Sequence, residues 1–101
     1  MRNLEKYKGV IPAFYACYDK EGNISPEGVQ ELTKYFVKKG VKGVYVNGSS
    51  GECIYQSVED RKIVLENVMK AAEGKLTVIA HVACNNTKDS QELARHAEEL
   101  G

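Results

Sequence analysis

The sequence predicts an α/β fold in which three strand–helix units follow one another and the strands run parallel. The motif Lys8-Gly9-Val10-Ile11 recurs 34 residues later as Lys42-Gly43-Val44-Tyr45, and a third apolar run begins 33 residues further on, after Lys75. An internal period of this kind indicates a repeated structural unit. Each run is short and rich in β-branched or aromatic residues, as in parallel strands covered on both faces. A segment with apolar residues at helical spacing follows each run.

The expected strands lie at residues 9–16, 43–47 and 76–82. Pro12 removes one backbone donor from the first of them and therefore predicts an irregularity or a strand end there. Alternating strands and helices imply right-handed crossovers, in half of an open sheet or in part of a closed barrel. A complete (β/α)₈ barrel needs about 250 residues, so three units are roughly three of its eight. We therefore expect residues 1–101 to be part of one domain that is truncated at its C-terminus.

Each expected helix has a start signal and ends at a glycine. Ser25 is a candidate N-cap before Pro26, which fits the first helical position, and Ser57 with Asp60 resembles a capping box. The third helix is expected to open at Thr87. The terminating glycines are Gly40, Gly74 and Gly101. The residues expected to face the core are Val29, Leu32, Phe36 and Val37, then Val64, Leu65, Val68 and Ala72, then Leu93, Ala94, Ala97 and Leu100.

Composition argues against several classes of partner. The chain has 14 Lys and Arg against 14 Asp and Glu, whereas nucleic acids and anionic membranes select basic surfaces. No run approaches the roughly 18 apolar residues of a membrane span. The odd, widely spaced cysteines Cys17, Cys53 and Cys84 fit a reduced, cytoplasmic chain. His81 and Cys84 lack a second ligand pair, so we expect no metal and no other cofactor.

Ligand sites of parallel α/β folds lie at the carboxyl ends of the strands. Three segments qualify, at residues 15–18, 47–52 and 81–86, and the second stands out. Asn47-Gly48-Ser49-Ser50-Gly51-Glu52 combines two glycines, which permit sharp turns, with two hydroxyls. Exposed amides and hydroxyls form a cradle for a carboxylate or phosphate oxygen. The spacing fits neither a P-loop nor a nucleophile elbow, and composition leaves both a plain turn and an anion site open.

The segment 45–52 resembles the signature of the N-acetylneuraminate lyase and dihydrodipicolinate synthase superfamily, whose loop after the second strand has the pattern Gly-Ser/Thr-Thr/Ser-Gly-Glu. The resemblance covers the whole chain: residues 8–13 and Tyr18-Asp19 resemble the first strand and its turn, and residues 78–82 resemble the third strand. Ala16-Cys17-Tyr18 stands where the family has Thr-Pro-Phe. The resemblance implies that the chain is the N-terminal three βα units of a (β/α)₈ TIM barrel, normally a homotetramer.

The resemblance also implies a class I aldolase, in which a lysine forms a Schiff base with pyruvate and the iminium acts as an electron sink. The loop sequence and the Ala-His-Val segment are closer to the lyases, which cleave N-acetylneuraminate (sialic acid) to pyruvate and N-acetylmannosamine. The family's carboxylate-binding loop maps onto Gly48, Ser49 and Ser50, with Ser49 also in a proton relay. Ala13 and Tyr45 map near the pocket. The alternatives are a dihydrodipicolinate synthase-like aldolase and a non-catalytic anion-binding or assembly module.

The Schiff-base lysine is expected beyond residue 101. Such a lysine must be desolvated inside the barrel so that its amine is neutral. Lys8, Lys42 and Lys75 precede their strands, at the edge opposite the site, and the remaining lysines on helices occupy polar positions. Within the loop, we expect Glu52 to brace the backbone by accepting amide hydrogen bonds.

Overall fold

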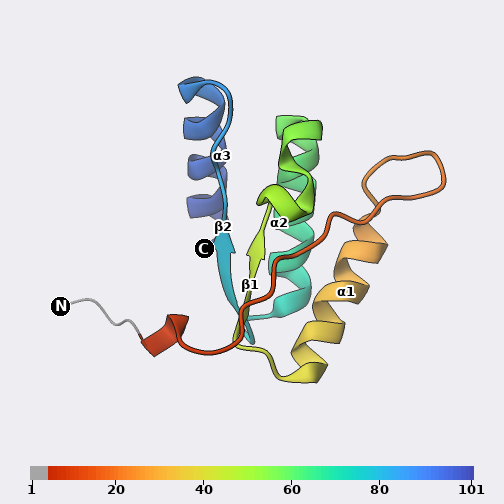
Figure 1. Cartoon of the computed structure of the whole chain (residues 1–101), viewed down its shortest axis with the longest axis vertical. Coiled ribbons are helices and arrows are strands. Elements are labelled where there is room, and N and C mark those ends of the chain that lie inside the picture. The colour runs from red at the N-terminus through yellow and green to blue at the C-terminus, as the bar shows by residue number, and fades with distance from the viewer. Residues whose placement is uncertain (1–4) are drawn as a thin grey trace.

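The computed structural model describes residues 5–101, and its elements alternate as the period predicts (Figure 1). The elements are the short 3₁₀ helix η1 (Glu5–Tyr7), α1 (Pro26–Lys39), β1 (Gly43–Val46), η2 (Ser49–Gly51), η3 (Cys53–Tyr55), α2 (Val58–Ala72), β2 (Thr77–Ala80) and α3 (Thr87–Leu100). The strands β1 and β2 pair in parallel, with Gly43 opposite Thr77 and Val46 opposite Ala80. The expected α/β fold with parallel strands is confirmed, and both strands are shorter than predicted.

The predicted first strand, residues 9–16, differs most from the structure. Its segment does lie beside β1, because the amide of Tyr45 donates to the carbonyl of Pro12 at 2.9 Å and the amide of Phe14 donates to that of Tyr45 at 2.8 Å. The structure nevertheless has only an isolated parallel bridge there, between Ala13 and Tyr45. Pro12 has no N–H to donate, and Gly9 at φ 122° turns the chain before it. The segment is therefore in the predicted place without forming a regular strand.

The helix caps follow the sequence signals closely. Ser25 accepts from the amide of Gly28 at 3.1 Å and Ser57 from that of Asp60 at 3.0 Å, so both serines satisfy otherwise unpaired helix N–H groups. Helix α1 ends at Gly40, with φ 76°. Helix α2 ends one residue earlier than predicted, because Glu73 already takes the left-handed conformation at φ 49°. Helix α3 begins at Thr87 as expected, with Asn86 as its cap.

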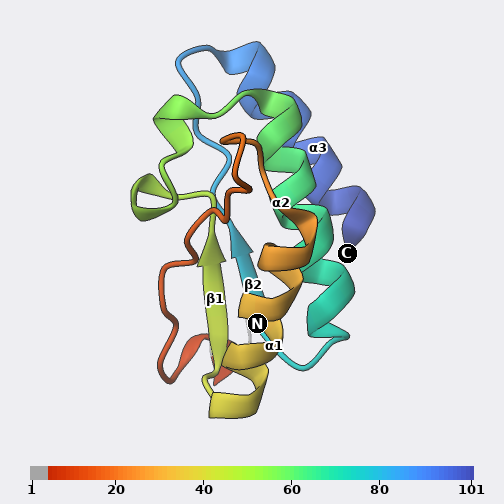
Figure 2. The ribbon, with the colours of Figure 1, turned by 90° about the vertical axis from the view of Figure 1, so that its right-hand side faces the viewer.

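The α-helices α1, α2 and α3 lie on one side of the strand pair, and Figure 2 shows no α-helix on the other side. Val44 and Val46 of β1 point toward the helices and are 0% exposed, whereas Tyr45 between them points to the open side and is 36% exposed. Alternate strand residues face opposite sides of a sheet, so the pattern is that of one covered face. The buried core gathers on the covered side: Phe14, Ile24, Val29, Val44, Val46, Val64, Leu65, Val68, Ala72 and Leu76.

One residue of the predicted core lies elsewhere. Leu93 of α3 is buried, but Ala94 is exposed. Successive helical residues are about 100° apart around the axis, so the residue after Leu93 turns away from α2, which α3 contacts. Within residues 5–101, no helix is long and apolar enough to cross a lipid bilayer.

Candidate functional site

The bend after β1 lies at the carboxyl edge of the sheet. Asn47 takes the left-handed conformation at φ 65°, and the chain then closes a tight 3₁₀ turn in which the amide of Gly51 donates to the carbonyl of Gly48 at 3.0 Å. Ser49 and Ser50 are exposed on this turn. Within residues 5–101 their amides and hydroxyls have no hydrogen-bond partner. Two adjacent hydroxyls and two unpaired amides are therefore available to an anion.

Three of the predicted site residues, Ala13, Tyr45 and Gly48, lie together where this bend leaves β1. The ring of Tyr45 presses on Gly48, where an added Cβ would lie 2.6 Å from the Tyr45 Cε1 atom. Ala13 bridges to Tyr45 on the neighbouring segment. The Tyr45 ring also lies 5.9 Å from the ring of His81, which follows β2. Residues from three consecutive units thus converge at one edge of the sheet.

The bend is braced by Gln56 and not by Glu52. The Gln56 side-chain amide donates to the carbonyl of Gly51 at 2.8 Å and to the hydroxyl of Tyr18 at 3.1 Å. Glu52 is exposed at φ 62°, and within residues 5–101 its carboxylate accepts no hydrogen bond. The expectation that Glu52 braces the backbone is therefore wrong. Gln56, five residues after Gly51, reaches back over the turn instead.

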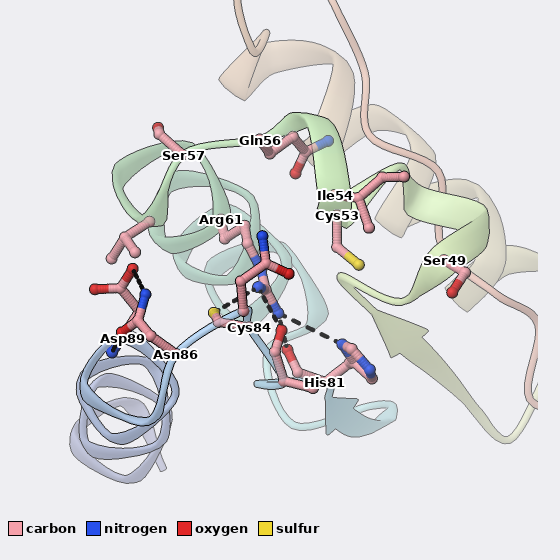
Figure 3. Close-up of a pocket in the computed structure, with 13 residues that line it drawn as sticks. Ser49, Cys53, Ile54, Gln56, Ser57, Arg61, His81, Cys84, Asn86 and Asp89 are labelled. Carbon is pink, nitrogen blue, oxygen red and sulfur yellow. Dashed lines mark hydrogen bonds between the residues drawn. The ribbon is translucent and has the colours of Figure 1, made fainter.

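A cleft of about 370 Å³ opens between the bend, the start of α2 and the segment after β2 (Figure 3). Of the predicted site residues, Ser49 lines this cleft, and Ser50, Gly48, Ala13 and Tyr45 do not. The lining residues are Ser49, Cys53, Ile54, Gln56, Ser57, Val58, Arg61, His81, Ala83, Cys84, Asn85, Asn86 and Asp89. Ser49 therefore stands where the bend and the cleft meet.

Arg61 occupies the centre of this cleft, and the sequence reasoning did not single it out (Figure 3). Although charged, Arg61 is only 3% exposed. Its guanidinium donates to the carbonyls of His81 at 2.8 Å and Ala83 at 2.9 Å, and to the Cys84 sulfur at 3.1 Å. Its backbone carbonyl accepts from the side-chain amide of Asn47 at 2.9 Å. The spacing held a signal, because Arg61 continues the buried stripe of Val64, Leu65 and Val68 along α2.

The cleft holds a buried cation, Arg61, that has no ion-pair partner among the described residues. Within residues 5–101, no carboxylate lies within 4.0 Å of the Arg61 guanidinium, whose Nε atom is buried and unpartnered. His81 and Cys84 both contact Arg61. Within the same residues, His, Cys, Asp and Glu side chains form no group of three that could hold a metal ion. Elsewhere, burial raises the pKa of the Cys17 thiol.

No lysine side chain that the structure describes lies in a desolvated pocket. Lys42 and Lys75 are exposed before β1 and β2, at the edge opposite the bend. Lys62 is the least exposed, at 21% of its side chain, and lies within 4 Å of the carboxylates of Glu59 and Glu92. These positions lie in water or beside carboxylates, unlike the desolvated site that a Schiff-base lysine needs.

Comparison with known proteins gives consistent matches. The model of the dihydrodipicolinate synthetase family matches residues 6–101. An N-acetylneuraminate lyase of Mediterraneibacter gnavus is 97% identical over 101 residues, which are 100% of this chain and 32% of that protein. The solved structure of a Ruminococcus gnavus sialic acid aldolase catalytic lysine mutant superposes with a TM-score of 0.99 at 97% identity, over 100% of this chain and 33% of that one.

A more distant structure gives the same picture. An N-acetylneuraminate lyase of Mycoplasma synoviae superposes with a TM-score of 0.93 at 38% identity, over 97% of this chain and 34% of that one. The chain therefore spans about a third of the length of the relatives it matches.

Proposed function

The chain belongs to the dihydrodipicolinate synthetase family, whose full-length members are (β/α)₈ barrels, and from this premise we propose that it is the amino-terminal part of a Schiff-base aldolase. The proposed reaction cleaves N-acetylneuraminate to pyruvate and N-acetylmannosamine. The 97% identity to an N-acetylneuraminate lyase supports the lyase over the synthase. In this proposal, residues 1–101 supply the pyruvate-carboxylate loop and the full-length protein supplies the nucleophile.

One structural observation carries the proposal: the adjacent Ser49 and Ser50 lie exposed on a bend at the carboxyl edge of β1, with amides and hydroxyls unpaired within the described residues. Hydrogen bonds to an ionised acceptor are shorter and about twice as strong as neutral ones. A keto-acid carboxylate bound there would hold its carbonyl carbon above the open side of the strands. Ala13 and Tyr45 lie below the bend, and the Tyr45 ring contacts Gly48 within it.

The proposed chemistry begins when a lysine amine condenses with the keto carbon of the open-chain sugar acid and releases water, which leaves an iminium. The bond between C3 and C4 then breaks as the C4 hydroxyl loses its proton, and the bonding electrons move into the iminium to give an enamine. Protonation of the enamine and hydrolysis release pyruvate and regenerate the amine. We place the hydroxyl of Ser49 in the relay that carries these protons, as the family resemblance implies, and its position on the bend at the cleft supports this placement.

The nucleophilic lysine is proposed to lie beyond residue 101. The described lysine side chains are solvated or ion-paired, which supports this placement. A homotetramer is proposed from the family resemblance, and the strongly exposed Ile54 and Tyr55 beside the cleft support a contact with another subunit. The free thiols of Cys17, Cys53 and Cys84 support a reducing, cytoplasmic location.

The test uses the full-length protein. Incubation with N-acetylneuraminate should release pyruvate, measured through NADH oxidation by lactate dehydrogenase. Borohydride reduction in the presence of pyruvate should trap a covalent adduct, which peptide mass spectrometry locates. An adduct on a lysine within residues 1–101 would show that our placement of the nucleophile is wrong.

Two further results would redirect the proposal. Condensation of pyruvate with aspartate semialdehyde, without cleavage of N-acetylneuraminate, would assign the protein to the synthase branch. Absence of both reactions and of any trapped adduct would favour a module that binds anions without chemistry. Analytical ultracentrifugation of the same preparation tests the tetramer.

A further inference from the structure

We infer that Arg61 is a positioning residue, which fixes the pyruvate-binding bend relative to the segment after β2. This inference rests on the proposed function. It adds to the proposed pyruvate site a residue that does not contact the hydroxyls of the bend. Arg61 bonds to the bend and to the segment after β2 at once, since its backbone carbonyl accepts from Asn47 and its side chain binds residues 81–84. Its burial at 3% exposure holds these bonds away from competing water.

The backbone side of this link acts on the bend. The side-chain amide of Asn47 donates to the Arg61 carbonyl at 2.9 Å, and Asn47 is 4% exposed. Asn47 takes the left-handed conformation directly before Gly48 and Ser49. Its φ sets the direction in which the bend leaves β1, so the bond to Arg61 fixes the position of the two serines.

The side chain of Arg61 binds the segment that follows β2. The planar guanidinium donates to the carbonyls of His81 and Ala83, which lie in the irregular segment between β2 and α3. A lysine in the same place would offer one point charge and no fork. A methionine would leave both carbonyls without this donor. The charge itself costs free energy to bury, and packing alone would be served by an apolar residue in the stripe of α2.

The experiment measures kcat and KM separately for pyruvate and for N-acetylmannosamine, in the condensation direction, with the full-length protein. Arg61→Met keeps the backbone carbonyl that binds Asn47 but loses the guanidinium bonds to residues 81–84, which uncouples the bend from that segment. We expect this to raise the KM for pyruvate roughly tenfold, because a misplacement of about 1 Å can cost up to ~10²-fold. The KM for the sugar should change much less. The KM for pyruvate of Arg61→Lys should lie between that of Arg61→Met and that of the wild type. Arg95→Met removes the same charge from an exposed position of α3 and should change neither constant.

A purely structural role would lower the yield of folded enzyme, and with it kcat, at an unchanged KM for pyruvate. That result for Arg61→Met would overturn the inference. If Arg61→Met does not fold, Asn47→Gly tests the inference instead. Glycine tolerates the left-handed backbone conformation but lacks the side-chain amide that donates to the Arg61 carbonyl. This variant should raise the KM for pyruvate roughly threefold or more, and an unchanged value would overturn the inference. Lack of aldolase activity in the wild type would overturn the proposed function and this inference together.

Discussion

The phenol ring of Tyr45 lies directly against the α-carbon of Gly48, with its Cε1 atom 2.6 Å from the place of a Cβ. Gly48 has φ −84° and ψ −169°, a conformation open to any residue. Its backbone conformation therefore does not require glycine, but the space beside the ring does. Because Tyr45 stands on the open side of β1, this contact sets the height of the serine bend above the sheet.

Gly48→Ala should therefore displace either the ring or the bend. We expect a loss of about 1–3 kcal/mol of stability from overpacking, seen as a lower thermal midpoint, and a higher KM for pyruvate. In a Tyr45→Ala background the same change should cost less than about 0.5 kcal/mol, since the contacting ring is gone. An equal cost in both backgrounds would show that Gly48 is required for another reason.

Gly43 has even less space for a Cβ than Gly48, because it lies where β1 pairs with β2. A Cβ at Gly43 would overlap the backbone carbonyl oxygen of Thr77, and a backbone atom in a parallel ladder has no rotamer to escape into. We expect Gly43→Ala to cost more than about 3 kcal/mol or to prevent folding. The measurement is the thermal midpoint and soluble yield of the full-length protein.

Gly28→Ala is the matched control for Gly43→Ala. A Cβ at Gly28 would lie 3.0 Å from the Cys17 Cβ and 3.2 Å from the Ser25 Oγ, so these neighbours need to move by only a few tenths of an ångström. Gly28 also lies in α1, where alanine is favoured by about 1 kcal/mol. The two effects should leave the thermal midpoint almost unchanged. A drop as large as that of Gly43→Ala would contradict the distinction between backbone and side-chain neighbours.

The features that the sequence predicted well are local ones. Ser25 and Ser57 cap their helices as predicted, because a cap depends only on a hydroxyl and an amide three residues later. The segment around Pro12 was harder, because whether it forms a strand depends on each of its N–H groups finding a partner on β1. Proline lacks that group, and the ladder reduces to a bridge at Ala13.

The same contrast between local and distant partners explains why only part of the candidate site was predicted. Ser49 was found from the glycine and hydroxyl pattern of its own loop. Arg61 and Gln56 were missed, because their partners are backbone carbonyls and a phenol that lie 22 and 38 residues away, at Ala83 and Tyr18. No residue type at those partner positions identifies a carbonyl acceptor. The only local signal was a charged residue in register with the apolar stripe of α2.

Cys17 gives a pH-dependent prediction. Burial raises the pKa of its thiol above the ordinary value, so at a given pH the reactive thiolate is scarcer than in a free cysteine. Alkylation of Cys17 by iodoacetamide at pH 8 should be slower in the folded protein than in urea, and the ratio of the folded to the unfolded rate should rise as the pH passes through the raised pKa. The folded state favours the protonated thiol, so its contribution to stability is present below the unfolded pKa and falls above it.

Peptide mass spectrometry of timed samples gives the alkylation rate of Cys17 in the folded and unfolded states. The unfolded sample is the control for reagent decay and for the intrinsic reactivity of the sequence around Cys17. Equal rates at pH 8 would contradict the effect of burial on this thiol.

Ser49 and Ser50 should differ in what their substitution changes. Each hydroxyl is proposed to donate to the pyruvate carboxylate, and a hydrogen bond to a charged group contributes about 1.5–3 kcal/mol. Ser49→Ala and Ser50→Ala should thus each raise the KM for pyruvate by roughly tenfold or more. Of these two serines, only Ser49 lines the cleft and is proposed in the proton relay. Only Ser49→Ala should therefore also lower kcat. Ser49→Thr should restore most of the lost kcat. Ser90→Ala, on α3, is the matched control and should change neither constant. A KM for pyruvate within twofold of the wild type in both alanine variants would rule out the two hydroxyls as ligands of the carboxylate.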